Sequence, residues 1–192
     1  MRLFRRFVRD RDGHVALEMA LVGPPFLLVM LALLDFGQTM LTQSVLDGAA
    51  RNAARLIRTG QVQASGSPIT TFQNQLCSDM SMLLTTSTCT SNVLFEVQTF
   101  SAYGTMTFTA CTYNNNATGT GTACTFAPGI GGNIIGVRAS YARPYIVPWV
   151  GACLTGGSCW TGVTGTNGTA QGTQTTTLTS TVIFQNEPFG TQ

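Results

Sequence analysis

The feature that most constrains this chain of 192 residues is a long apolar run near its start. The run covers twenty residues, from Val15 to Leu34, and Glu18 is the only charged residue within it. At about 1.5 Å per residue, a helix of this length spans about 30 Å, the thickness of the hydrocarbon core of a bilayer. The sequence therefore predicts a single transmembrane helix.

The charges beside this run predict how the helix is oriented. Five of the ten arginines lie in the first eleven residues, and the chain has no lysine. The positive-inside rule places such a leader in the cytoplasm and the C-terminal part outside, in the periplasm or beyond. Because the net charge of +2 belongs to this leader, the sequence does not support nucleic acid as a partner. A cleaved secretory signal is the alternative, but its apolar region is usually only about 7–15 residues long.

We expect three segments along the chain. Residues 1–13 form the basic cytoplasmic leader, and residues 14–58 form one helix that crosses the membrane over about 15–34 and becomes amphipathic over 35–58. Residues 59–192 form an extracytoplasmic domain. Two prolines interrupt the apolar part of the helix and predict a kink or local unwinding there, namely Pro24 and Pro25.

The amphipathic extension carries a stripe of mostly small apolar residues at helical spacing. The stripe consists of Leu46, Ala49, Ala50, Ala53, Ala54 and Ile57. It packs either on another helix or, as we favour, on the protein's own domain. On another face, Asp47 and Arg51 have the spacing of an ion pair, and Thr59-Gly60 is a plausible stop for the helix.

The remainder predicts an α+β fold, in which the long N-terminal helix packs on an antiparallel sheet with one wet face. A short helix is expected over 71–84. Alternating apolar and polar residues predict strands, which are expected at 93–98, around 106–110, at 134–141, at 145–147 and at 175–184.

Six cysteines all follow the apolar run, and an even number in an exported domain predicts disulfides. We expect nearest neighbours to pair, each bond adding about 3 kcal/mol in the chain-entropy model. The pairs are Cys77–Cys89, Cys111–Cys124 and Cys153–Cys159. A metal site is disfavoured, because no CxxC pair and no histidine occurs among these cysteines.

The sequence gives no support for an enzyme or for a cofactor. The only histidine, His14, is at the membrane, and the external carboxylates are few. The glycines at 129–132 do not have the spacing of a dinucleotide loop, since position 134 is isoleucine, and a turn is the better interpretation.

The start of the apolar run resembles the processing site of type IV prepilins. Gly13 follows the basic leader, His14 opens the apolar run, and Glu18 lies five residues after the glycine. Cleavage after Gly13 would give Glu18 a positively charged amino terminus as a partner, and a carboxylate inside a membrane helix is usually functional. The alternative is that Glu18 only reaches the lipid headgroups.

A wider set of motifs resembles the TadE-like family of Flp-type (tight-adherence) pilus systems. The set consists of Arg11-Asp12-Gly13, Val15-Ala16-Leu17-Glu18-Met19-Ala20, Pro24-Pro25, Asp35-Phe36-Gly37, Ala49-Ala50-Arg51-Asn52-Ala53-Ala54-Arg55 and the ending Asn186-Glu187-Pro188-Phe189. The resemblance implies a minor pseudopilin in the inner membrane that is cut by a prepilin peptidase and supports adhesion. Its implied partners are other pilins or pseudopilins and assembly-platform proteins, besides the bilayer. The alternative is an unprocessed, single-pass, membrane-anchored binding module or adhesin.

Overall fold

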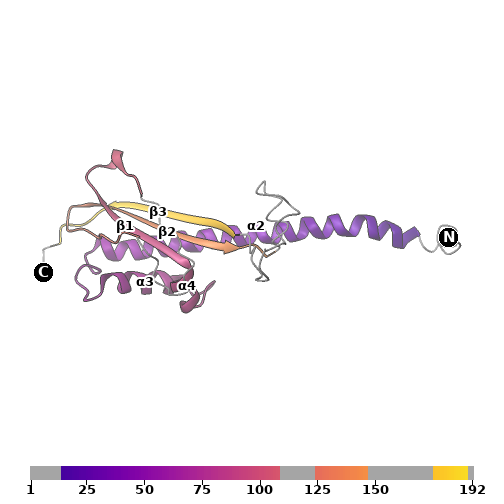
Figure 1. Cartoon of the computed structure of the whole chain (residues 1–192), viewed down its shortest axis with the longest axis horizontal. Coiled ribbons are helices and arrows are strands. Elements are labelled where there is room, and N and C mark those ends of the chain that lie inside the picture. The colour runs from indigo at the N-terminus through magenta and orange to yellow at the C-terminus, as the bar shows by residue number, and fades with distance from the viewer. Residues whose placement is uncertain (1–13, 109–123, 147–174, 190–192) are drawn as a thin grey trace, which may run out of the picture. The chain divides into compact units, whose positions relative to one another are not determined.

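The computed structural model describes residues 14–108, 124–146 and 175–189 (Figure 1). The chain divides into two compact units, one of residues 1–38 with 144–174 and one of residues 39–143 with 175–192. In each unit we consider only the described residues. The helix α2, His14–Arg58, contributes its first part to the first unit and its second part to the second.

The first unit consists of the start of α2 and a short piece of chain at Pro144. Over this part of α2 large apolar side chains are exposed, and the helix is long and apolar enough to cross a membrane. It is not unwound at Pro24 and Pro25, which lie inside it. The buried exception is Asp35, whose Oδ1 accepts a hydrogen bond of 3.1 Å from the backbone N–H of Ile146.

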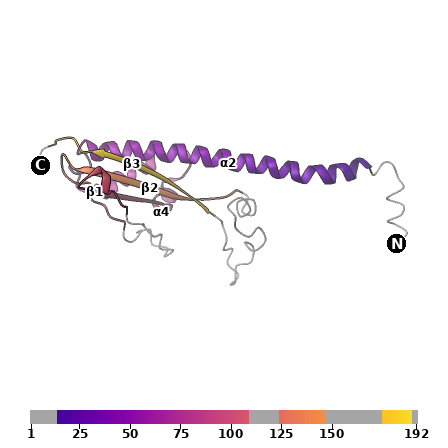
Figure 2. The same cartoon turned by 90° about the horizontal axis from the view of Figure 1, so that it is seen from above.

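The second unit is an α+β domain, as the alternation of the sequence predicts. Its sheet has the order β1-β2-β3, with β1 at Val93–Phe100, β2 at Ile134–Pro144 and β3 at Thr175–Gln185. β1 and β2 are antiparallel, with Val97 opposite Val137. The second part of α2 and the helices α3, Pro68–Asp79, and α4, Thr86–Asn92, lie on one side of this sheet (Figures 1 and 2).

The core lies between the helices and the inner face of the sheet. The predicted small-residue stripe of α2 is completely inside it, because each of its six members is at most 2% exposed. The stripe therefore packs on the protein's own domain. Three aromatic rings fill the space beside it, Phe72 of α3, Phe95 of β1 and Phe126, with centroids 5.2 to 6.0 Å apart.

The predicted helix over 71–84 is two helices. α3 begins at Pro68, a residue suited to the first turn, and ends at Asp79. α4 begins after Thr85, whose side chain accepts a hydrogen bond from the N–H of Thr88. A disulfide between Cys77 and Cys89 joins the two helices, with a Cα–Cα distance of 5.6 Å, and this is the pair that the nearest-neighbour rule predicts.

The prediction of a strand around 106–110 is wrong for its described part. Residues 106–108 have no regular structure and follow the short 3-10 helix η2, Tyr103–Thr105. Phe108 lies instead on the outer face of the sheet, where it packs on Phe100 and leaves no room for a Cβ on Gly136. The segment predicted at 145–147 is not a strand in its described residues, because β2 ends at Pro144.

The outer face of the sheet is only partly wet. Glu96 of β1 points to this face but is only 1% exposed. It pairs with Arg138 of β2 at 2.6 Å and accepts a hydrogen bond from Gln98, while the Arg138 guanidinium lies 5.0 Å from the centre of the Phe108 ring. A buried carboxylate needs such partners, because leaving it unpaired costs several kcal/mol.

Candidate functional site

The first candidate site is the start of α2, where the sequence predicts processing. Gly13 lies outside the described residues, and His14 is the first residue of the helix. Glu18 is exposed on the helix surface among Leu17, Met19 and Leu21, each at least 70% exposed. The helix therefore presents a carboxylate within an apolar surface.

This apolar surface continues along α2. Its largest exposed side chains between 17 and 41 are Leu17, Met19, Leu21, Val22, Phe26, Leu27, Val29, Met30, Leu33, Leu34, Phe36, Met40 and Leu41. A surface of this size on a soluble monomer would be exceptional, because contiguous apolar patches larger than a few hundred Å² mark contact with a membrane or a partner. The helix fits a single-pass membrane anchor.

The second candidate site is at the other end of α2, where the C-terminal segment passes. The helix ends at Arg58, and Gly60, two residues further on, has a φ of 78° and faces the ring of Phe189 so closely that a Cβ would lie 2.8 Å from it. The positive φ and the close approach of Phe189 both require glycine at this position, which the sequence predicts as the stop of the helix. A hydrogen bond also holds the C-terminal segment against the end of α2, since the N–H of Glu187 donates to the carbonyl of Arg58 at 3.0 Å.

Asn186 anchors this C-terminal segment. It is only 3% exposed, and its Nδ2 donates to the carbonyls of Pro128 and Ile130 at 2.9 and 3.1 Å. Its backbone N–H donates to the carbonyl of Asn133, and its own carbonyl accepts from Gly132. Sequence reasoning gave this residue no role, and its only signal was the Asn-Glu-Pro-aromatic ending.

The glycine-rich segment at 129–132 is a turn, and it receives these hydrogen bonds. Gly129 and Gly132 have φ angles of 64° and 85°, which side-chain-bearing residues rarely adopt. A Cβ on Gly129 would also lie 2.8 Å from Cδ1 of Ile135. The turn is therefore part of the domain's framework, and it brings Asn186 and Glu187 to the end of α2.

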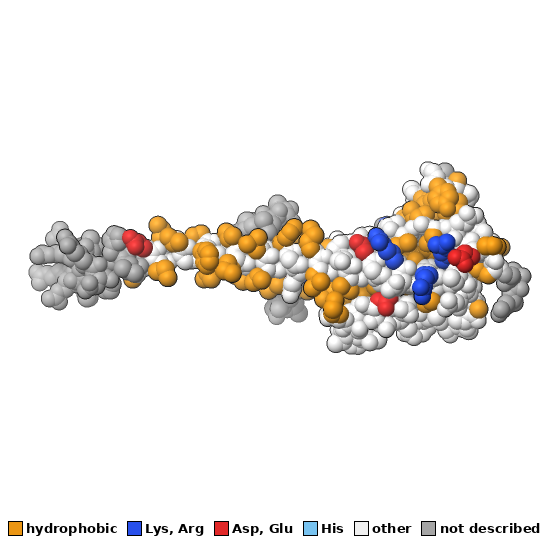
Figure 3. Space-filling view, turned by 180° about the vertical axis from the view of Figure 1, so that it is seen from behind, with side chains coloured by type: hydrophobic (Ala, Val, Ile, Leu, Met, Phe, Trp, Pro, Cys, Tyr) orange, Lys and Arg blue, Asp and Glu red, His pale blue; other side chains and the backbone are white. Residues whose placement is uncertain are grey.

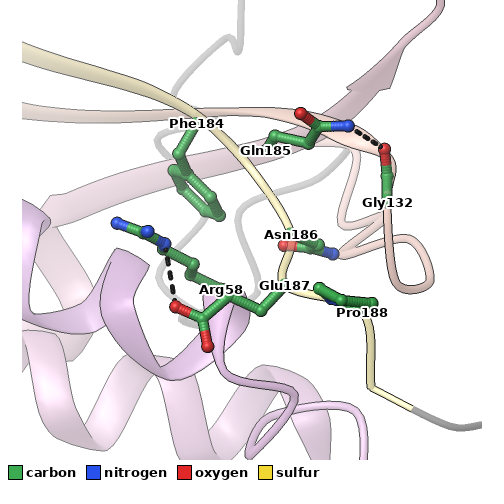
Figure 4. Close-up of a pocket in the computed structure, with 7 residues that line it drawn as sticks. All are labelled: Arg58, Gly132, Phe184, Gln185, Asn186, Glu187 and Pro188. Atoms are coloured by element: carbon green, nitrogen blue, oxygen red, sulfur yellow. Dashed lines mark hydrogen bonds and ion pairs between the residues drawn. The ribbon is translucent and has the colours of Figure 1, made fainter.

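An open pocket of about 630 Å³ lies between these elements (Figure 4). Its lining residues are Arg58, Gly132, Phe184, Gln185, Asn186, Glu187 and Pro188. Arg58 and Glu187 form an ion pair at 3.3 Å between Nε and Oε1, and both side chains are 54% exposed. An exposed pair of this kind contributes at most about 1 kcal/mol to stability, so a partner of opposite charge could compete with Glu187 for the guanidinium.

A third polar cluster lies inside the domain near Thr39 of α2. Arg143 of β2 is 4% exposed and donates from Nη1 to Oγ1 of Thr39 at 2.9 Å. Two residues earlier, burial raises the pKa of the Tyr141 phenol, and the positive charge of Arg143 offsets part of that rise. Because Arg143 and Tyr141 are both buried, we assign the cluster to the framework of the domain.

The remaining predicted site residues are cysteines. Cys124 is disulfide-bonded, but its predicted partner Cys111 lies outside the described residues, as do Cys153 and Cys159. Within the described part of the chain, no group of three or more histidine, cysteine or acidic side chains could hold a metal ion.

Comparison with known proteins gives one match. The model of the TadE-like protein family matches residues 13–55, which cover α2 from its start to its last turn. These residues include Glu18, Asp35 and the alanine–arginine repeat. The match associates the chain with Tad/Flp pilus systems. No curated protein and no solved structure is significantly similar to the chain.

Proposed function

We propose that this chain, with its TadE-like domain at residues 13–55, is a minor pseudopilin that serves the assembly of a Flp-type (type IVb, tight-adherence) pilus. It resides in the inner membrane with the leader in the cytoplasm and the domain outside. A prepilin peptidase removes residues 1–13, so that the mature chain begins at His14. Its partners are other pilins or pseudopilins and the assembly platform.

The observation that carries this proposal is the exposed apolar surface of α2 with one carboxylate at its start. A helix that served only as a tether would gain nothing from Glu18, since a charge in a bilayer is costly. If His14 becomes the amino terminus, its ammonium group supplies a charge partner for Glu18 of a neighbouring subunit. This contact would set the axial position of one subunit against the next.

Processing is tested by the intact mass and N-terminal sequence of the membrane-purified native protein, with and without the host's prepilin peptidase. We expect a chain that begins at His14 only when the peptidase is present. A chain that begins at Met1 in both cases would contradict the proposal. It would favour the alternative, an unprocessed membrane-anchored binding module or adhesin.

The role of Glu18 is tested by Glu18→Ala with Glu18→Asp as the matched control. We expect Glu18→Ala to insert and to be cleaved as the wild type is, but to lower pilus number by about tenfold or more, since it removes an ion pair in a low-dielectric medium. Glu18→Asp keeps the charge and should retain part of the piliation. Normal piliation with Glu18→Ala would remove Glu18 from assembly, whatever the result of the cleavage test.

A further inference from the structure

Three arginines form an exposed ridge on the second part of α2. Arg51, Arg55 and Arg58 follow one another at spacings of four and three residues, which place them on one face of a helix. They are the exposed arginines of the described chain, since Arg138 is half-buried and Arg143 is buried. Figure 3 shows basic side chains close together on one face of the domain, with acidic side chains beside them.

The domain itself neutralises little of this ridge. Glu187 pairs with Arg58, but within the described residues no acidic group pairs with Arg51 or Arg55. The ion pair that the sequence predicts between Asp47 and Arg51 does not form there, and Oδ1 of Asp47 accepts from Gln43 instead. The helix dipole favours Arg55 and Arg58 in the last turn, but it does not account for Arg51.

The pocket beside Arg58 adds a second, independent feature. Oδ1 of Asn186, a pocket-lining residue, is buried and has no hydrogen-bond partner. The carbonyls of Pro128 and Ile130 require the amide nitrogen on their side, so the oxygen must face the other way, as in Figure 4. A buried acceptor without a hydrogen bond is unfavourable, and a donor from a bound partner would satisfy it.

The geometry points to a docking surface for an acidic segment of a partner protein. Carboxylates of the segment pair with Arg51 and Arg55, and at the Arg58 end an N–H of the segment donates to Asn186. A peptide supplies both groups, carboxylates from side chains and N–H from its backbone. This inference goes beyond the proposed function, because it concerns a surface of the folded domain whether or not the leader is removed.

A protein segment fits this surface better than lipid headgroups do. Leu41 is the last large exposed apolar residue of α2, and Arg51 lies ten residues further, about 15 Å along the helix axis. Arg58 is about 25 Å from Leu41 by the same measure. Arginine also suits carboxylates in particular, since its planar guanidinium binds them through two parallel hydrogen bonds.

The test uses the full-length protein in nanodiscs of zwitterionic lipid. The probe is a fluorescent helical peptide with glutamates at positions i, i+4 and i+7, and its binding is followed by anisotropy. We expect Arg51→Gln with Arg55→Gln to weaken binding by roughly tenfold, the effect of two exposed ion pairs. The matched control is Arg5→Gln with Arg6→Gln, which removes the same charge from the leader and should weaken binding much less.

A gain of binding gives the sharper test, because misfolding cannot produce it. Glu187→Gln frees the Arg58 guanidinium, so it should tighten binding of the acidic peptide by a few-fold. A peptide with glutamine in place of glutamate should not bind. The inference is overturned if the two double variants weaken binding equally, if Glu187→Gln does not tighten it, or if vesicles of phosphatidylglycerol compete the peptide off the ridge.

Discussion

The two parts of α2 differ in the exposure of their apolar residues. In the part before Gln38 the large side chains point outward, and Leu21 is 77% exposed. In the part after Thr39 the apolar face is made chiefly of alanines, and Ala50 and Ala53 are 0% exposed. One helix therefore carries two apolar surfaces, and among the described residues only the second is covered by other parts of the chain.

The difference in side-chain size follows from what covers each surface. Alanines let the sheet and α3 approach the α2 backbone closely, which is what a core between a helix and a sheet requires. The first part of α2 fits a membrane anchor, and large side chains on an anchor need no such close fit, because hydrocarbon tails adapt to them. In this helix the face packed on the domain is therefore rich in alanine, whereas the exposed part carries large apolar side chains.

The difference in packing between the two parts of α2 is tested most strongly by Leu46→Ala, with Leu27→Ala as the matched control. Leu46 is 0% exposed, so its truncation leaves a cavity and should lower the free energy of unfolding of the domain by about 2–5 kcal/mol. Leu27 is 58% exposed, so its truncation should leave that energy unchanged. Urea unfolding of the full chain in nanodiscs, followed by pulse proteolysis, measures both. Equal losses would mean that the two parts do not differ in packing.

The same difference in packing is tested by enlarging a side chain in each part of α2 instead of truncating one. Ala53→Leu inserts three carbons into a filled core and should lower the free energy of unfolding by about 1–3 kcal/mol. Ala20→Leu adds the same carbons to an exposed position of the same helix and should have no effect on the domain. If Ala53→Leu were as stable as the wild type, the stripe would not be close-packed.

Periodic patterns in the sequence predicted the elements that make this core. The stripe from Leu46 to Ile57 and the three strands were predictable, because helical and alternating spacing directly report burial. The break after Asp79 was not, since no glycine or proline marks it. Met106 to Phe108 alternates like a strand but lies on the sheet, because the missing side chain of Gly136 leaves room for the Phe108 ring.

The candidate sites divide in the same way. Glu18 was predicted because a lone carboxylate in an apolar run is conspicuous in any sequence. Asn186 was not, because its partners Pro128 and Ile130 are 58 and 56 residues away, and no local pattern reports such a contact. The same holds for the absent Asp47–Arg51 pair, since the competing hydrogen bond from Gln43 depends on side-chain geometry.

The smallest expected effect concerns Tyr141, which closes the buried inner face of β2 and is 7% exposed. Burial raises its pKa above the ordinary value of about 10, although Arg143 counteracts this in part, so the folded state holds the phenol proton more tightly than the unfolded state does. The contribution of the protonated Tyr141 phenol to the stability of the folded state is therefore fully present below pH 10 and is lost as the pH rises through the raised pKa. Tyr141→Phe has no proton to lose, so its free energy of unfolding should fall less steeply above pH 10 than that of the wild type. Tyr103→Phe, at a position 59% exposed, is the control for loss of a phenol, and urea unfolding at several alkaline pH values would show the difference. If Tyr141→Phe and the wild type lost stability in parallel, the Tyr141 phenol would not be as deeply packed in the covered part of the domain as its exposure indicates.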